Sequence, residues 1–306
     1  MSEMIICNVC PHACRLSPGD IGACGARGYS GEESPDALRA GDCGDELRAS
    51  GKGGTTPLNY GIAASLALDP IEKKPLKRFF PGSRIVSFGS FGCNLRCPFC
   101  QNYEISTRSV RYFDTEEMQN AYISPENLLK TALKYKSKGN IGVAFTYNEP
   151  LISYEYVIDT AKLLKQHDMK TVLVTNGCVN GEIADRVLPW VDALNIDLKS
   201  FQAEVYEKIL KGDLETVKSF IEKAHRTCHV ELTSLIVPGM NSEPGEMEKL
   251  SSWVASLEGG SKIPLHVTRF FPRYRMEDEQ PTDVELIYLL AGIAKEKLEY
   301  VYIGNC

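Results

Sequence analysis

The sequence predicts an α/β fold in which parallel strands form a closed or partly closed barrel, preceded in the chain by a Cys- and Gly-rich extension. Three observations lead to this prediction. Between residues 84 and 304, apolar β-branched runs alternate with amphipathic runs of helical period. Such alternation forms βαβ units, whose strands lie parallel in one sheet. Polar motifs follow the expected strands one after another, and residues 1–60 show neither period.

The expected elements follow one another along the second part of the chain. Strands are expected at 84–88, 141–147, 171–175, 193–198, 229–237, 264–269 and 300–303. Helices are expected near 125–138, 152–167, 180–188, 202–210, 214–226, 244–257 and 282–297. The first helix is best marked, because Ser124 suits the N-cap, Pro125 the first helical position and Gly139 the end. We therefore expect two domains, an extension over 1–78 and a barrel over 79–306.

Composition and charge exclude several classes of protein. The 306 residues, 43% of them hydrophobic and 24% charged, can bury a sizeable core. No apolar run reaches the ~18 residues of a membrane span, and the first residues lack the features of an export signal. The net charge of −6 disfavours nucleic-acid binding. Eleven cysteines in such a chain indicate thiols and metal ligands in a reducing cytoplasm.

The most informative motif is the segment Cys93-Asn-Leu-Arg-Cys97-Pro-Phe-Cys100, which follows the first expected strand. A complete 4Fe–4S site takes four Cys thiolates, so three thiolates leave one iron open, as in catalytic metal sites. Gly89 and Gly92 before the motif let the backbone approach a bulky inorganic group. Alone, the spacing also fits part of a zinc site. The preceding strand and the later motifs favour an iron–sulfur cluster.

Together with the later strand-end motifs, this loop resembles the radical S-adenosylmethionine (SAM) enzymes. The resemblance implies an incomplete, TIM-like (β/α)6 barrel and a 4Fe–4S cluster held by Cys93, Cys97 and Cys100. It also implies that SAM binds the open iron and is cleaved reductively to a 5′-deoxyadenosyl radical, which abstracts hydrogen from a substrate. A one-electron donor such as flavodoxin or ferredoxin would reduce the cluster. The protein supplies binding and orientation around these cofactors.

The resemblance assigns SAM-binding roles to residues at the ends of the second and third strands. Asn148 and Glu149 occupy the place of the family's Gly-Gly-Glu motif, and Glu149 would bind the SAM ammonium group. Thr175 and Asn176 resemble the pair that contacts the ribose or carboxylate of SAM. Two structural alternatives stay open: Glu149 also suits a helix start, and Asn176-Gly is a common turn.

Further residues would line the same cavity. Asp197 and Lys199 lie two positions apart on a strand and share one face, where they line the SAM cavity or form a buried ion pair. His266 matches a strand-borne His near the adenine of glycyl-radical activating enzymes, but it also suits a core residue. The backbone of Phe99 would contact adenine, or its ring simply packs.

A second group of cysteines lies in the extension, at Cys7, Cys10, Cys14 and Cys24. Four thiolates suit tetrahedral zinc or a second iron–sulfur cluster. Free thiols packed at the domain edge are the third alternative.

The whole motif set resembles the AmmeMemoRadiSam system radical SAM enzymes, which are related to pyruvate formate-lyase activating enzymes. It consists of an N-terminal Cys-x2-Cys-Pro-x2-Cys with Gly-x2-Gly-x-Cys-Gly-x-Arg, then Phe-Gly-Cys-Asn-Leu-x-Cys-Pro-Phe-Cys-Gln-Asn, Thr-Tyr-Asn-Glu-Pro and His-Val-x-Arg-Phe-Phe-Pro. The resemblance implies AMMECR-type and Memo-type protein partners. Two other functions are weighed against it: activation of a glycyl-radical enzyme, and non-catalytic iron–sulfur or metal binding.

Overall fold

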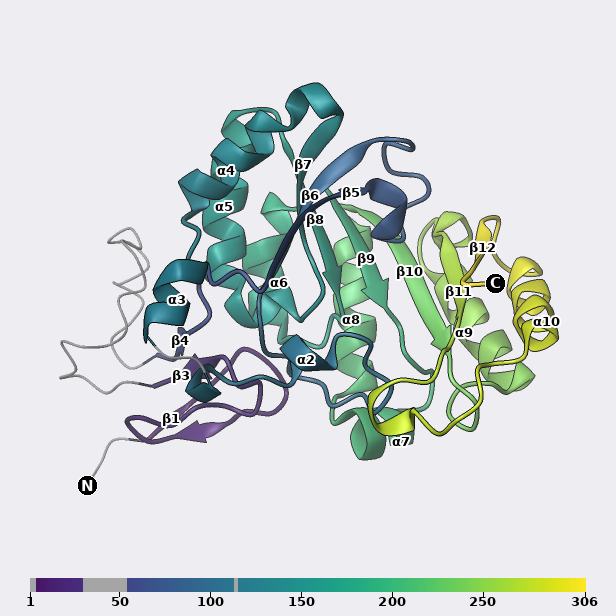
Figure 1. The fold of residues 1–306 in the computed structure, drawn as a ribbon. Coiled ribbons are helices and arrows are strands. Elements are labelled where there is room, and N and C mark those ends of the chain that lie inside the picture. The colour runs from purple at the N-terminus through teal and green to yellow at the C-terminus, as the bar shows by residue number, and fades with distance from the viewer. Residues whose placement is uncertain (1–3, 30–53, 113–114) are drawn as a thin grey trace.

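The computed structural model describes residues 4–29, 54–112 and 115–306 (Figure 1). Its main sheet has eight strands in the order β12-β11-β10-β9-β8-β7-β6-β5. They are β5 (Ser65–Pro70), β6 (Arg84–Gly89), β7 (Asn140–Phe145), β8 (Lys170–Thr175), β9 (Ala193–Asp197), β10 (His229–Ile236), β11 (Leu265–Arg269) and β12 (Val301–Gly304). From β6 to β12 all neighbours are parallel, and β5 is antiparallel to β6. Among the described strands, β5 and β12 are the two edges, so the barrel is partial, as predicted.

The helices cover the outer side of this curved sheet (Figure 1). They are α4 (Pro125–Lys134), α5 (Tyr154–Gln166), α6 (Gly181–Val187), α7 (Ala203–Val205) with a π-helix over Tyr206–Leu210, α8 (Leu214–His225), α9 (Pro244–Ser256) and α10 (Val284–Lys295). In the described ranges no helix combines the length and the apolar character that a bilayer crossing needs.

The predicted start of α4 is confirmed. The Ser124 side chain accepts a hydrogen bond from the N–H of Asn127, and Pro125 occupies the first turn, where its missing N–H costs nothing. The helix ends earlier than predicted, at Lys134, and a 3-10 turn continues to Lys138. Gly139 closes this turn with a φ of 84°, the left-handed conformation that glycine adopts most easily.

The N-terminal segment contains four strands of two residues each, paired β1–β2 and β3–β4. They are β1 (Ile5–Ile6), β2 (Arg15–Leu16), β3 (Arg27–Gly28) and β4 (Thr56–Pro57). The sequence analysis missed these strands and also β5, which lies inside the predicted extension but pairs with β6. This pairing favours a boundary before Ser65, and the division into two domains stays a prediction.

The amino end of the barrel is closed by residues 71–78, here called the 71–78 segment. The Lys74 ammonium group is 1% exposed and donates to Asp69 Oδ2 at 2.8 Å, and the Tyr147 hydroxyl donates to the same oxygen at 2.6 Å. Asn195 of β9 donates to the Pro75 carbonyl at 3.0 Å. These contacts tie the segment to β5, β7 and β9.

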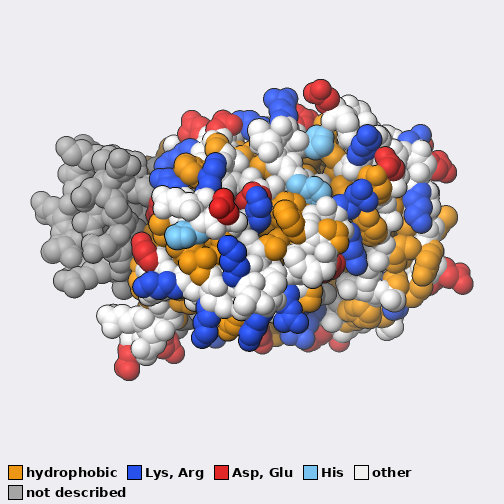
Figure 2. All heavy atoms as spheres, turned by 90° about the horizontal axis from the view of Figure 1, so that it is seen from above, with side chains coloured by type: hydrophobic (Ala, Val, Ile, Leu, Met, Phe, Trp, Pro, Cys, Tyr) orange, Lys and Arg blue, Asp and Glu red, His pale blue; other side chains and the backbone are white. Residues whose placement is uncertain are grey.

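Glu231 of β10 anchors the rest of this segment and is fully buried. It accepts the N–H groups of Lys77 and Arg78 at 3.0 and 2.7 Å, and it contacts His229 and His266 at 3.0 and 2.7 Å. Burial alone would raise the pKa of Glu231, but these hydrogen bonds outweigh it and lower the pKa to about 2. Seen from this end, the surface is filled by side chains, Lys and Arg among them (Figure 2).

Candidate active site

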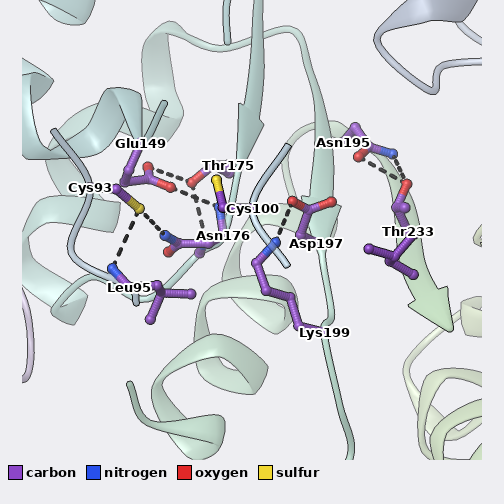
Figure 3. Close-up of polar contacts among 12 residues, drawn as sticks. Cys93, Leu95, Cys100, Glu149, Thr175, Asn176, Asn195, Asp197, Lys199 and Thr233 are labelled. Carbon is purple, nitrogen blue, oxygen red and sulfur yellow. Dashed lines mark hydrogen bonds and ion pairs between the residues drawn. The ribbon is translucent and has the colours of Figure 1, made fainter. Parts of the chain in front are cut away.

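The carboxyl ends of the parallel strands bring the predicted motifs together. Strands β6, β7, β8 and β9 are successive neighbours, so the loops that follow them meet at one edge of the sheet. The three-Cys loop follows β6, and helix α2 (Tyr103–Ser106) continues it beneath the strand ends in Figure 1. Figure 3 shows Cys93, Glu149, Asn176 and Asp197 converging there from these loops.

The loop before Cys93 is held by a set of backbone contacts. Gly92 has a φ of 85°, and a Cβ there would lie 2.7 Å from the carbonyl oxygen of Cys24, so only glycine fits. The side-chain amide of Asn148 donates to the carbonyls of Phe91 and Gly92 at 3.1 Å each, and its oxygen accepts the N–H of Ser90 at 3.0 Å. Asn148 therefore fixes the loop, and its predicted contact with SAM stays a prediction.

The thiols of the loop are in an environment that suits metal ligands. Cys93 Sγ accepts hydrogen bonds from the N–H of Leu95 at 3.4 Å and the Asn176 amide at 3.7 Å (Figure 3). Burial raises the pKa of Cys93 well above its usual value, and the charge of Glu149 adds to this effect. Burial also raises the pKa of Cys97 to about 11, although the charge of Lys199 opposes it. Burial thus favours the protonated thiols of Cys93 and Cys97 until a cation balances the charge of the thiolates.

The donor set fits a 4Fe–4S cluster. Cys93, Cys97 and Cys100 come from one loop, and the charges of Cys97 and Cys100 both act on the pKa of Cys93 because the three sulfurs share one neighbourhood. Among the described residues, no three His, Cys, Asp or Glu side chains already form a site for a metal ion. In a cluster each thiolate binds a different iron, so the sulfur atoms do not have to converge on one point.

Glu149 is 1% exposed and lies at the end of β7. Its Oε1 accepts the Thr175 hydroxyl at 2.7 Å and the N–H of Leu151 at 2.9 Å, and its Oε2 accepts the N–H of Asn176 at 2.8 Å. Burial raises its pKa to about 7, although these three donors oppose the rise. Glu149 also caps the short 3-10 helix Pro150–Ser153, so the predicted helix-start role is confirmed. A buried carboxylate with a pKa near neutrality is typical of functional sites.

Asn176 connects two of the loops. Its amide donates to Asn94 Oδ1 at 2.9 Å as well as toward Cys93, and Asn94 in turn donates to the carbonyl of Cys178 at 2.7 Å. Sequence reasoning missed Asn94, which is 1% exposed and holds the first turn of the three-Cys loop. Its position directly after Cys93 in the three-Cys motif could have indicated this role.

Asp197 and Lys199 form an ion pair at the end of β9. Lys199 Nζ lies 2.8 Å from Asp197 Oδ2, and the Lys199 N–H donates to the Tyr206 hydroxyl at 3.1 Å. Burial would lower the pKa of Lys199, but the charges of Asp197 and Cys97 outweigh it and raise the pKa. The ion pair is therefore confirmed, although it is only partly buried, since the Lys199 and Asp197 side chains are 17% and 33% exposed. The charge of Lys199 also acts on Cys97 of the three-Cys loop. Its contact with SAM stays a prediction.

Two other predicted residues are engaged in packing. His266 contacts Glu231 at 2.7 Å, and its ring lies 5.3 Å from that of Tyr302. These partners belong to the network at the 71–78 segment and not to the group around Cys93, so the predicted contact of His266 with adenine stays a prediction. Phe99 is buried in the main core, and the role of its backbone also stays a prediction.

A loop from the far end of the chain packs on the three-Cys loop. The Arg275 N–H donates to the carbonyl of Pro98 at 3.0 Å. The rings of Tyr103 and Tyr274 stack with centroids 4.7 Å apart and an interplanar angle of 11°. The segment after β11 therefore shields the loop from solvent on one side.

Comparison with known proteins identifies the family. Residues 88–251, more than half of the chain, match the model of the Radical SAM superfamily. An uncharacterized protein of Methanocaldococcus jannaschii is 36% identical over 98% of this chain and 80% of its own. The pyruvate formate-lyase-activating enzyme of Clostridium pasteurianum is 26% identical over 72% of this chain and 93% of its own.

Solved structures share the fold at low sequence identity. Streptococcus suis SuiB bound to S-adenosylmethionine has a TM-score of 0.53 at 12% identity and covers 72% of this chain and 52% of its own. A mutant of spore photoproduct lyase has a TM-score of 0.51 at 12% identity and covers 79% of this chain and 80% of its own. Fold, family match and strand-end site agree, so this chain belongs to the radical SAM superfamily and is an enzyme that uses a 4Fe–4S cluster to cleave SAM.

Proposed function

We propose that Cys93, Cys97 and Cys100 hold the 4Fe–4S cluster and leave one iron open for SAM. The observation that carries this proposal is the position of the loop, at the carboxyl end of β6 and beside the buried carboxylate of Glu149. The cluster and SAM, once bound, supply a 5′-deoxyadenosyl radical that abstracts hydrogen from a substrate. The N–H groups that point at Cys93 Sγ stabilise the thiolate form that a metal needs.

Glu149 is proposed to bind the amino group of SAM. Thr175 and the N–H of Asn176 hold its two oxygens in place, so little reorganisation is needed when a cation arrives. An ammonium group beside Glu149 would also offset the burial that raises its pKa to about 7. Asp197 and Lys199 would contact the polar parts of SAM from the neighbouring strand, next to Cys97.

The closed amino end of the barrel supports entry of SAM and substrate from the carboxyl end. The 71–78 segment fills this end of the barrel through the contacts of Lys74 and of Pro75. SAM and substrate would then enter from the carboxyl end. Exclusion of water from the rest of the interior protects a radical from side reactions.

The test is anaerobic reconstitution with iron and sulfide. The reduced protein is expected to show the EPR signal of a 4Fe–4S cluster and to form 5′-deoxyadenosine from SAM with dithionite. Cys97→Ala should abolish both, whereas the matched control Cys228→Ala, in the same chain but bonded to the Val191 carbonyl, should keep both. A fully loaded protein that leaves SAM intact would contradict the proposal.

Within the superfamily we place the chain in the AmmeMemoRadiSam branch. The motif set that runs from Cys7 to Pro272 supports this assignment. AMMECR-type and Memo-type proteins are then the expected partners. Co-purification with tagged partners from one expression host tests this, and recovery no better than with an unrelated protein would contradict it. We also propose a cytoplasmic location, because eleven cysteines and an iron–sulfur centre require a reducing compartment.

Activation of a glycyl-radical enzyme is the second candidate function. It is favoured by the match to pyruvate formate-lyase-activating enzymes, at 26% identity for that of Clostridium pasteurianum and 25% for that of Escherichia coli. It predicts that a partner protein, after turnover, carries a doublet EPR signal from a backbone glycyl radical. A flavodoxin or ferredoxin is the expected electron donor for either function.

A further inference from the structure

The N-terminal segment, residues 4–29, packs directly on the three-Cys loop. The N–H of Cys93 donates to the carbonyl of Cys24 at 3.1 Å. His12 Nε2 lies 2.6 Å from the carbonyl oxygen of Asn94, and the Arg96 guanidinium group donates to the carbonyl of Ala23. Cys93, Asn94 and Arg96 of the loop are therefore bound to the segment that carries the four N-terminal cysteines.

The backbone of this segment gathers its four cysteines. The N–H of Cys7 donates to the carbonyl of Cys14 at 2.9 Å, and the N–H of Ala23 donates to Cys14 Sγ at 3.3 Å. The N–H of Ala13 donates to the carbonyl of Cys10 at 3.2 Å, and the N–H of Gly25 donates to the carbonyl of Gly22 at 2.9 Å, in the turn that contains Cys24. These short turns bring the four cysteines into one part of the segment.

The segment has little regular secondary structure of its own. Its strands β1, β2 and β3 have two residues each. Its buried cysteines, Cys7, Cys10 and Cys24, take the positions that apolar side chains would fill in a larger core. Small units of this kind are usually stabilised by disulfides or by a structural metal, and every described cysteine is a free thiol.

We propose that Cys7, Cys10, Cys14 and Cys24 bind a single zinc ion, and that this ion holds residues 4–29 against the three-Cys loop. The positioning effect rests on the proposed role of Cys93 as a cluster ligand, whereas the zinc site itself does not. Each thiol that binds releases its proton to solvent. The four sulfur atoms are not arranged as a metal site in this structure. Binding of zinc would therefore require the Cys side chains to move closer together.

Zinc suits this site better than iron. Four thiolates in tetrahedral arrangement, with a Cys-x2-Cys pair, are a common structural zinc set. Zinc has no redox chemistry, so it would hold the loop of Cys93 without competing for the electron that this loop is proposed to receive.

The metal content of two full-length variants tests the site. In Cys93→Ala/Cys97→Ala/Cys100→Ala, which lacks the proposed cluster ligands, we expect one zinc per chain and no iron or sulfide. Adding Cys10→Ser and Cys14→Ser should remove the zinc, whereas adding Cys228→Ser should not. Titration of the wild type with a mercurial reagent should release zinc into a chromogenic chelator even if the multiple variants fold poorly. No zinc, or iron with sulfide at these cysteines, would overturn the proposal.

Hydrogen exchange in the wild-type holoenzyme tests the coupling. Removal of zinc is expected to speed exchange of the amides of residues 92–97 roughly tenfold, the effect of weakening one hydrogen bond. The amides of α10, remote from the segment, serve as the control. Unchanged exchange at residues 92–97 would overturn the coupling between the zinc ion and the three-Cys loop. Cluster formation and SAM cleavage are measured separately on the same sample, so a failure of the proposed function is distinguishable from a failure of the coupling.

Discussion

Asn176 joins the carboxylate of Glu149 to the thiol of Cys93. Its main-chain N–H donates to Glu149 Oε2 at 2.8 Å, and its side-chain amide lies 3.7 Å from Cys93 Sγ. The same amide donates to Asn94 at 2.9 Å. One residue of β8's loop therefore fixes the distance between the proposed ammonium-binding group and the proposed cluster loop.

Asn176→Ala is expected to loosen this connection. Asn94 Oδ1 loses its donor, and leaving a buried acceptor unpaired costs about 1–3 kcal/mol in the free energy of unfolding. Urea unfolding of the metal-free protein measures this cost, and the iron content after gel filtration measures cluster retention, which should fall. Asn127→Ala, at an exposed position of helix α4, is the control. Equal free energies of unfolding and equal iron contents in the two variants would contradict this role of Asn176.

The stability of the metal-free protein is expected to depend on pH through Glu149. Its pKa is about 7 in the folded protein against a usual 4.5, because it is buried. The folded form thus binds a proton between these values that the unfolded form has lost. The free energy of unfolding should therefore fall as pH rises from about 5 to about 7, by a few kcal/mol from this group.

Glu149→Gln should remove that part of the pH dependence. Urea titrations across this pH range, for the wild type and the variant, give two slopes whose difference belongs to Glu149. Equal slopes would contradict the assignment, whatever the absolute stability of the variant.

The buried pair Arg27–Glu155 is expected to attach the N-terminal segment to α5. The nitrogen and oxygen lie 2.8 Å apart, and the side chains are 3% and 12% exposed. Arg27→Met leaves the Glu155 charge buried and unpaired, which should lower the free energy of unfolding by about 3–5 kcal/mol. The matched control is Lys208→Met, since the pair Lys208–Glu204 is 67% and 71% exposed and solvent screens the attraction between its charges. Similar losses from both substitutions, in urea unfolding, would refute the prediction.

Tyr147 occupies a position that favours glycine, with a φ of 74°. Its hydroxyl offsets this strain through the 2.6 Å bond to Asp69, and its ring lies 4.4 Å from Lys74 Nζ. Tyr147→Phe keeps the ring and the strain but loses the bond, so it should cost about 1.5–3 kcal/mol, as for hydrogen bonds to charged groups. Thermal unfolding monitored by circular dichroism tests this. A melting temperature equal to that of the wild type would show that the hydrogen bond from Tyr147 to Asp69 contributes no net stability.

Most of the parallel strands were predictable because they are buried on both sides and read as apolar runs, as at Arg84–Gly89 and Lys170–Thr175. Strand β5 was missed because it is an edge strand that ends in Pro70, within a segment of mixed composition. The helices were predictable from their period and, at α4, from the Ser124 cap.

The site was predictable in part. The motif residues lie together because parallel strands place their ends at one edge, a rule that needs no side-chain detail. Their hydrogen bonds depend on contacts between distant segments. Nothing in the sequence showed that Asn148 would bind the backbone before Cys93, or that Glu231 would engage His266.

Segments from the N-terminal and C-terminal parts of the chain both contact the three-Cys loop. The Cys24 carbonyl accepts the N–H of Cys93, and the N–H of Arg275 donates to the carbonyl of Pro98. Loss of either contact would expose more of an iron–sulfur centre in this loop to dioxygen. The lifetime of the cluster in air would then measure how tightly the two segments pack on the loop, independently of any measurement of SAM cleavage. Weakening either contact would make the enzyme more sensitive to oxygen without changing a proposed cluster ligand.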